Sequence, residues 1–273
     1  MLAENNDAKK IFMKKGACSQ AFFYMLNREF GHHYELEEIA SDPFAGGILR
    51  QGYQCGMLWG ASLSVGAESY RMSHDLEKAS FMAVRATQKL MESFKNLTKS
   101  HDCLDITDTD FNSKFQFAKF MVFKAHSCFN LARDWAQDAT LAAAESLGVS
   151  VTDGCKNCIG CSGVLAKKMG ASDAQAAMVA GFAGGMGLSG NACGAFATAL
   201  WIKSIEWCRS NPGKSPYSLP ELKTVYEKFN KITDYKILCS EITGRNFNSL
   251  DEHSEFINAG GCSSLIEKLA GEA

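Results

Sequence analysis

Apolar residues recur three and four positions apart along most of the chain, which is the spacing of an amphipathic helix. Residues 4–30 follow this pattern, with Gly16 as a break just before Cys18. Residues 113–147 follow it longest, and one face of this predicted helix carries Ala118, Met121, Ala125, Cys128, Ala132, Trp135 and Ala139. No stretch alternates apolar and polar residues as a half-buried strand would. The pattern predicts an all-α protein.

Capping signals divide the rest of the chain into further helices. We expect Cys55 to open a helix that runs to about Tyr70, and Ser73 to cap the next one. Ser172 and Gln175 form a capping-box pattern at the start of another helix. The segments 103–107 and 239–243 are expected to be turns, and Cys262 is expected inside the last helix.

A glycine-rich segment occurs twice in the sequence. Residues 44–56 and residues 182–194 both read F-A-G-G-x4-G-x2-C-G, with no gap between the copies. A shared pattern of this length indicates an internal duplication. We therefore expect two related helical bundles, residues 1–148 and residues 149–273, fused in one chain and related by a pseudo-two-fold axis.

The duplication extends to most of the cysteines. A Cys-x-[Asp/Glu]-Ile-Thr-x3-Phe pattern occurs at 103–111 and 239–247, and a Cys-x2-Leu pattern at 128–131 and 262–265. A Cys-Ser pair heads each copy. Each half thus has four matched cysteines: Cys18, Cys55, Cys103 and Cys128 in the first, and Cys161, Cys193, Cys239 and Cys262 in the second.

Composition narrows the classes of function. The chain has 273 residues and a net charge of −2, with no basic cluster, which argues against nucleic-acid binding. The uncharged stretch 174–202 contains a glycine-rich break, so we expect a buried core segment and no membrane span. The polar N-terminus lacks an export signal, which predicts a reducing, cytoplasmic location where structural disulfides are disfavoured. Eleven cysteines then indicate metal binding or redox chemistry.

Four converging thiolates form the ligand set of a 2Fe–2S or 4Fe–4S cluster, and zinc accepts the same ligands. Buried thiolates without a cation are strongly disfavoured, so a bound metal centre would resolve that cost. Glycines allow backbone N–H groups to approach sulfur closely, and such hydrogen bonds tune reduction potential. The glycines assigned to this role are Gly47, Gly52, Gly56, Gly185, Gly190 and Gly194.

Three other cysteines have no counterpart in the first half. Cys155 and Cys158 precede Cys161 in a Cys-x2-Cys-x2-Cys run that resembles the start of a bacterial ferredoxin motif, with Cys193 as a possible fourth ligand. Alternatively, the run is a dithiol that exchanges electrons with the neighbouring site. Cys208 is expected in the core. The Gly-x-Gly-x-x-Gly spelling at 185–190 follows a helix and not a strand, so we do not expect dinucleotide binding there.

The Cys-Gly segments and the Cys-x-[Asp/Glu]-Ile-Thr segments together resemble the C_GCAxxG_C_C family of redox-active proteins, once in each half. The central triplets stand here as Cys-Gly-Met and Cys-Gly-Ala, and the later glycine is Gly60 in the first copy but Thr198 in the second. The resemblance implies redox activity. A related helical domain in split-Soret cytochromes is associated with an iron–sulfur centre, which implies a cluster here too.

We therefore expect an electron-transfer protein with one cysteine-bound iron–sulfur centre per half. Its electrons would be exchanged with an unidentified redox partner protein, and a homo-oligomer remains possible. Two alternatives stay open: a metal-free thiol–disulfide oxidoreductase, and a protein that stores zinc or copper(I). The sequence leaves open whether a substrate is transformed. All three readings require that the four matched cysteines of each half meet in one pocket.

Overall fold

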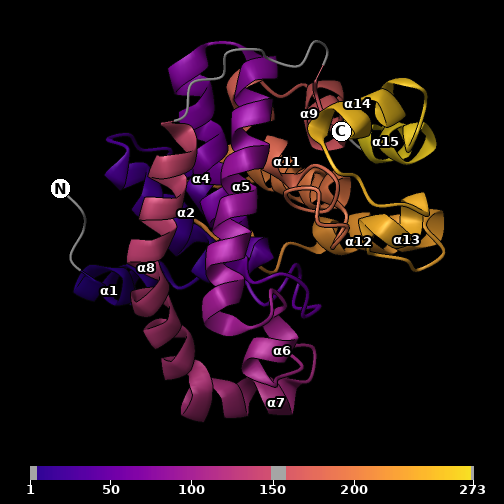
Figure 1. The fold of residues 1–273 in the computed structure, drawn as a ribbon. Helices are drawn as coiled ribbons and strands as arrows, with labels where there is room; N and C mark the ends of the chain where they lie inside the picture. The colour runs from indigo at the N-terminus through magenta and orange to yellow at the C-terminus, as the bar shows by residue number, and fades with distance from the viewer. Residues whose placement is uncertain (1–4, 149–157, 272–273) are drawn as a thin grey trace.

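The computed structural model describes residues 5–148 and 158–271, and within them all regular structure is helical (Figure 1). The first repeat contains α1 (Asn5–Lys15), α2 (Cys18–Glu29), α3 (Glu35–Ala40), η1 (Asp42–Phe44), α4 (Gly56–Ser73), α5 (Leu76–Thr98), α6 (Cys103–Thr107), α7 (Lys114–Lys119), η2 (Phe120–Lys124) and α8 (Ala125–Leu147). The second contains α9 (Cys161–Lys168), α10 (Asp173–Met178), η3 (Ala180–Phe182), α11 (Gly194–Ser210), α12 (Pro220–Ile232), α13 (Cys239–Thr243), α14 (Leu250–Asn258) and α15 (Ser263–Ala270).

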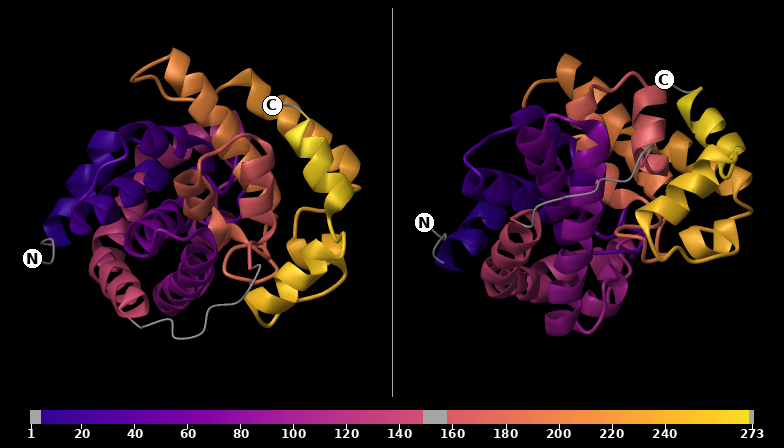
Figure 2. Two further views of the ribbon diagram at one scale, coloured as in Figure 1. Left: turned by 90° about the horizontal axis from the view of Figure 1, so that it is seen from above. Right: turned by 45° about the horizontal axis from the view of Figure 1, so that its top comes forward.

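Equivalent helices appear in the same order in both repeats but differ in length. The long helices α5 and α8 have 23 residues each, whereas their counterparts α12 and α15 have 13 and 8. In Figures 1 and 2 the long helices of the first repeat stand together as a bundle, and the shorter helices of the second repeat wrap one side of it. The all-α prediction is confirmed, and the second repeat is a shortened version of the first.

Local signals set several helix boundaries. Gly16, with φ of +84°, ends α1 and lets α2 begin at Cys18, as expected. The capping box of Ser172 and Gln175 is formed at α10. The expected cap at Ser73 was wrong: α4 continues through that residue, and the Asp75 side chain accepts a hydrogen bond from the Lys78 N–H to begin α5. An aspartate is as good a cap as a serine, so the sequence allowed both positions.

The long helix predicted over 113–147 is interrupted by a π-helical turn, η2. A π-turn adds a residue to the helix and rotates what precedes it. As a result Ala118 and Met121 face solvent, contrary to the predicted stripe, while Phe120 is buried. Later members of the stripe, including Trp135 and Ala139, are buried as predicted.

Two expectations about cysteine-bearing segments also need correction. Residues 103–107 and 239–243 each form one helical turn, α6 and α13, and not simple turns. Cys262 does not lie inside the last helix. It caps α15 in a left-handed conformation, with φ of +59°, whereas its counterpart Cys128 lies within α8. The shorter second repeat therefore reaches the same sulfur position through a helix end.

The two repeats share one apolar core. The Phe44 ring lies edge-on to its own counterpart Phe182, with 5.7 Å between ring centroids, and Trp59 packs edge-on to Phe182 at 4.7 Å. A residue that contacts its own counterpart lies on the axis relating two copies, as a pseudo-two-fold arrangement requires. The Trp201 indole also donates across the interface to the Glu37 carbonyl.

The helices of the described residues include none long and apolar enough to cross a membrane. The uncharged stretch 174–202 instead contains η3, the second glycine loop and the start of α11, and nearly all of it is buried. This placement agrees with its interpretation as a core segment.

Candidate redox centres

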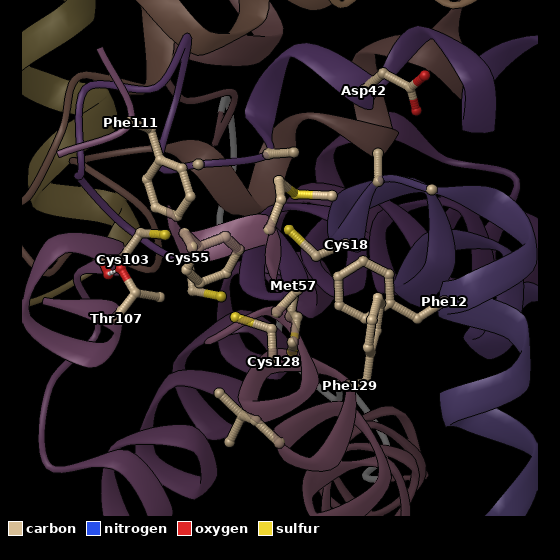
Figure 3. A pocket seen from close by; sticks show the side chains of 18 of the residues that line it. Phe12, Cys18, Asp42, Cys55, Met57, Cys103, Thr107, Phe111, Cys128 and Phe129 are labelled. Atoms are coloured by element: carbon tan, nitrogen blue, oxygen red, sulfur yellow. Dashed lines mark hydrogen bonds between the residues drawn. The ribbon is translucent and has the colours of Figure 1, made fainter. Parts of the chain in front are cut away.

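The four matched cysteines of the first repeat meet at one cavity. Cys18, Cys55, Cys103 and Cys128 all line a cavity of about 380 Å³ (Figure 3). Four separate elements deliver them: the first residue of α2, the residue that caps α4, the first residue of α6, and α8. Figure 3 shows their sulfur atoms directed toward a common space. The spatial requirement deduced from the sequence is therefore met in this repeat.

Apolar side chains form most of the remaining wall. The rings come from both ends of the repeat and from the second repeat: Phe12, Phe111, Phe117, Phe120, Phe129 and Tyr217. Arg50 stacks on both Phe117 and Tyr217, with its guanidinium carbon 5.0 and 4.6 Å from the ring centroids, and donates to the Tyr217 hydroxyl. Arg50 thus ties a loop of the second repeat over the cysteines of the first.

Cys18 is the thiol in this cavity that is best placed to ionise. A hydrogen bond with the Cys55 thiol, helped by the backbone N–H groups of Gly46 and Ser19, lowers the pKa of Cys18 despite its burial. The same hydrogen bond, together with burial and the neighbouring thiolate, raises the pKa of Cys55 well above its usual value. The pair therefore favours one thiolate and one thiol.

The other two sulfurs of this repeat are held as neutral thiols. Burial, followed by the charges of Cys18 and Cys128, raises the pKa of Cys103 well above its usual value. Burial and the charge of Cys18 raise the pKa of Cys128 to about 12. Because the charges on these sulfurs influence one another, the four groups act as one electrostatic unit. Additional thiolates here would need a cation to compensate them.

The four matched cysteines of the second repeat influence one another's charges in the same way. Burial and the charge of Cys161 raise the pKa of Cys262 to about 12, and the same two causes contribute to raised pKa values at Cys193 and Cys239. Cys161, the counterpart of Cys18, again has a lowered pKa. Each half thus combines one thiolate-forming cysteine with three thiols held neutral.

The glycine loops shape these sites, and two glycines that the sequence interpretation did not select contribute backbone N–H groups. The N–H of Gly46 hydrogen-bonds the Cys18 sulfur, and the equivalent Gly184 N–H does so for Cys161. Gly46 also lines the cavity. The signal was present in the sequence, because both glycines are fixed in the duplicated motif. Four of the chosen glycines have a positive φ that the loop turns require: Gly47, Gly52, Gly185 and Gly190.

The two remaining glycines permit close packing at the start of α4 and α11. A Cβ atom on Gly56 would lie 2.5 Å from the Cys18 sulfur. One on Gly194 would collide with the Phe182 carbonyl oxygen and would lie 2.8 Å from the Ser162 hydroxyl. The Cys-Gly pair therefore lets the helix that follows each loop approach the helix that begins with the first cysteine of the repeat.

His253 is a component of the second site that the sequence interpretation missed. Its ring lies beside Cys161, and after the opposing effect of burial it is the main influence on the pKa of Cys161, which it lowers through its charge and a hydrogen bond. The histidine is 1 % exposed and packs edge-on to Phe247, with 4.8 Å between ring centroids. The first repeat has no histidine lining its cavity.

The three cysteines without a counterpart in the first repeat differ in their structural state. Cys155 lies outside the described residues. Cys158 is disulfide-bonded, which contradicts the expectation that disulfides are disfavoured, and its sulfur lies 3.3 Å from Asp251 Oδ1. It is fully buried in a small apolar cluster with Cys239 and Phe247, next to the second site. Cys208 is a free thiol, 2 % exposed, in the core as expected.

The sulfurs surround a space and do not converge on a point. A single tetrahedral zinc ion bound at about 2.3 Å from each sulfur requires sulfurs about 3.8 Å apart. Across the described parts of the chain, no three His, Cys, Asp or Glu side chains form a group that could hold one metal ion. The cysteines are therefore not arranged as a preformed single-ion site.

The Gly-x-Gly-x-x-Gly loop at 185–190 lies between two helical segments. The loop follows the 3₁₀-turn η3 and precedes α11, and no strand leads into it. A Rossmann loop connects a strand to a helix, so this glycine spelling lacks the necessary context.

Comparison with known proteins identified one family. The family described as putative redox-active protein (C_GCAxxG_C_C) matches twice, over residues 17–141 and over residues 155–273. No curated protein and no solved structure matched the chain. Both matches include a full set of four cysteines, a glycine loop and the Cys-Gly pair after it. The chain therefore belongs to the C_GCAxxG_C_C family of redox-active proteins and carries its unit twice in tandem.

Proposed function

We propose that each repeat holds a polynuclear iron–sulfur cluster and that the protein transfers electrons through these centres. Cys18, Cys55, Cys103 and Cys128 would be the ligands in the first repeat. In the second, Cys161, Cys193, Cys239 and Cys262 would take the same part. The observation that carries the proposal is the convergence of four thiols, from four separate elements, on one cavity.

Chemistry and space both favour a cluster over a single ion. Four thiolates are the commonest ligand set of 2Fe–2S and 4Fe–4S clusters. In a cluster the metal atoms lie between the sulfurs and keep them apart, which suits thiols that surround a cavity of about 380 Å³. Iron would also supply the positive charge that these buried sulfurs need in order to ionise together. Zinc or copper(I) storage is less well supported, because no group suited to a single ion is formed by the described residues.

The protein itself would position the cluster and tune it. Gly46 and Gly184 offer backbone N–H groups to the first cysteine of each repeat, and hydrogen bonds to cluster sulfurs raise reduction potential. Aromatic rings would keep water from the first centre, which also influences its potential. Electrons would be exchanged with a separate redox protein.

One preparation tests the proposal. The chain is purified without oxygen, and iron and acid-labile sulfide are measured per chain. We expect a brown protein with iron and sulfide in near-equal amounts, and an electron paramagnetic resonance signal on reduction. A colourless protein that contains neither iron nor sulfide would contradict the proposal.

Cysteine variants locate the metal. Cys103→Ser should remove about half of the iron, because it breaks one ligand set and leaves the other complete. Cys208→Ser is the matched control: this thiol is equally buried, and its sulfur lies 3.9 Å from the Lys214 carbonyl, outside both ligand sets. It should retain all of the iron. Equal iron loss in both variants would indicate general destabilisation and not ligation.

The hydrogen-bonded pair of Cys18 and Cys55 supports a second candidate function, a metal-free thiol–disulfide oxidoreductase. A thiolate beside a thiol is the arrangement from which a disulfide forms when an oxidising partner protein takes two electrons and one proton is released. This function predicts a colourless protein that loses two titratable thiols on oxidation and regains them on reduction. Cys18→Ser should abolish that reversible loss.

A further inference from the structure

The two repeats differ at one aromatic position next to the cysteines. In the first repeat, Phe111 is followed by Phe117 and Phe120. In the second repeat, the counterpart Phe247 is followed at the same spacing by His253 and Phe256. The duplicated pattern is therefore Phe-x5-Phe-x2-Phe in one half and Phe-x5-His-x2-Phe in the other.

The structure keeps these positions equivalent. The Phe111 ring contacts Phe117 edge-on at 6.1 Å and Phe120 at 4.9 Å, measured between ring centroids. The Phe247 ring contacts His253 at 4.8 Å and Phe256 at 5.3 Å. The three-ring clusters therefore correspond ring for ring. His253 occupies the place of a cavity-lining phenylalanine and adds two nitrogen atoms there.

One of these nitrogens, Nδ1, lies beside the residue that precedes Cys161. A Cβ atom on Gly160, the residue before Cys161, would lie 3.4 Å from both Nδ1 and Cε1 of His253. Nδ1 is buried and has no hydrogen-bond partner of any kind, sulfur included, among the residues that the structure describes. Leaving a buried ring nitrogen unpaired is destabilising, so a neighbouring group that can accept a hydrogen bond from it is favoured. The ring therefore lies beside the residue that precedes Cys161, with a nitrogen free to donate to that sulfur, and the charge of His253 contributes to the lowered pKa of Cys161.

We propose that His253 hydrogen-bonds the Cys161 sulfur and gives the second redox centre a higher reduction potential than the first. The inference rests on the proposed function, namely that each repeat contains a cysteine-based redox centre. An N–H donor withdraws electron density from a thiolate sulfur and stabilises the reduced centre. His253 acts through Cys161 and is therefore a positioning residue.

His253 is expected to raise the reduction potential of the second centre whether that centre is an iron–sulfur cluster or a dithiol. In a cluster, the reduced form carries one more electron, and a donor beside a ligand sulfur favours it. In a dithiol, the reduced form contains the thiolate that the imidazole stabilises, and a stabilised thiolate makes the disulfide more oxidising. When both centres carry the same cofactor, one electron leaves the first repeat and arrives at the second. Electron transfer within the fused chain would then have a preferred direction, which two identical copies of the unit would lack.

Variants that exchange the two repeats' own residues test this idea. His253→Phe installs the residue that the first repeat uses, and Phe117→His makes the reciprocal change. On protein purified without oxygen, a redox titration followed by electron paramagnetic resonance gives the midpoint of each centre. We expect two midpoints in the natural chain, and His253→Phe should lower the higher one and narrow the gap. Phe117→His should raise the midpoint of the first centre.

A structural role alone would not produce this result. His253→Gln retains an N–H donor and should keep part of the gap, whereas His253→Phe should lose most of it. Circular dichroism and the iron content per chain confirm that each variant is folded and loaded. If His253→Phe is folded and carries full iron but has unchanged midpoints, the proposal is overturned. If Phe117→His does not fold, the midpoints of His253→Phe and His253→Gln are sufficient to test the proposal.

The outcome is separable from the proposed cluster. If the purified chain contains no iron, the cluster proposal fails, and the midpoints are then measured on the thiols. The chain is equilibrated in a series of thiol–disulfide buffers, alkylated, and analysed by mass spectrometry at Cys18 and Cys161. A higher midpoint at Cys161 that falls in His253→Phe supports the role of His253. Equal midpoints, or no response to the variant, overturn it.

Discussion

Gly56 links the backbone to the chemistry of the first centre at the scale of one residue. It begins α4 directly after Cys55, and its α-carbon faces the Cys18 sulfur without a side chain between them. The Cys18 sulfur in turn hydrogen-bonds Cys55, which lowers the pKa of Cys18 and raises that of Cys55. The absence of a side chain at Gly56 therefore leaves room for the Cys18 sulfur beside Cys55.

We predict that Gly56→Ala destabilises the protein although alanine is the better helix former. The new methyl group would lie 2.5 Å from the Cys18 sulfur, so the sulfur or the helix must move, at a cost of about 1–3 kcal/mol. Urea denaturation measures the loss. Gly271→Ala is the matched control, since this glycine also has an ordinary negative φ and a Cβ there has only normal contacts. Equal stability of the two variants would contradict the prediction.

Asp42 makes the free energy of unfolding depend on pH. Burial raises the pKa of its carboxyl to about 6, although Ser215 donates a hydrogen bond to it. A raised carboxyl pKa means that the folded state binds more protons than the unfolded state between about pH 4 and 6. Stability is therefore lost as the pH rises through this window, by on the order of 3 kcal/mol at neutral pH.

Asp42→Asn should remove that loss, because an amide keeps an acceptor for Ser215 but carries no charge. Unfolding free energies from urea titrations at pH 4, 5, 6 and 7 should diverge in favour of the variant as the pH rises. Asp138→Asn alters an exposed aspartate and serves as the control. A constant difference between Asp42→Asn and the natural chain over this range would refute the assignment.

At the scale of elements, the glycine loop positions the cysteine that follows it, and the π-turn η2 orients the phenylalanine rings that line the first cavity. The loop was predictable because it recurs, with the same seven residues, in both halves. The π-turn was not, because an apolar pattern three and four residues apart fits a regular helix equally well. Its consequence is visible in Phe120, which is buried while the neighbouring Met121, Val122 and Phe123 are 54–72 % exposed.

In the candidate sites, too, the residues that recur in both halves could be predicted from the sequence, and those that differ between the halves could not. Eight cysteines could be assigned because each has a partner motif in the other half, and the four in the first half meet as predicted. His253 could not be assigned in this way, because it replaces the phenylalanine that stands at the equivalent position of the first repeat. The aligned positions of Phe111 and Phe247 contained the signal, but its meaning depends on a contact with Cys161 that only the folded chain reveals.

Deletion of Val122 should convert η2 into a regular helical turn and damage the first centre. Removing one residue rotates the preceding helix by about 100°, which would turn Phe117 and Phe120 away from the cavity. Loss of Phe120 burial alone costs about 1.5–3 kcal/mol. The deletion should reduce stability and iron binding in the first repeat. Val122→Ala, which trims an exposed side chain without changing the register, should do neither.

At the scale of the whole molecule, the shared core makes the two centres interdependent. Phe182 belongs to the glycine loop of the second repeat, yet it packs against Phe44 and Trp59 of the first. Tyr217, also from the second repeat, lines the cavity of the first centre and is held there by Arg50. Because the contacts at the axis belong to both repeats, neither half can bury its own core alone.

We therefore predict that a lesion on the axis unfolds both repeats together. Phe182→Ala removes a fully buried ring and should cost about 3–5 kcal/mol. Thermal unfolding should remain a single transition at lower temperature, and iron should be lost from both centres together, not from the second repeat alone. Tyr235→Ala, at a ring that is 77 % exposed, should leave the transition unchanged. Two separate transitions in Phe182→Ala, with the first centre intact, would mean that the repeats are independent domains.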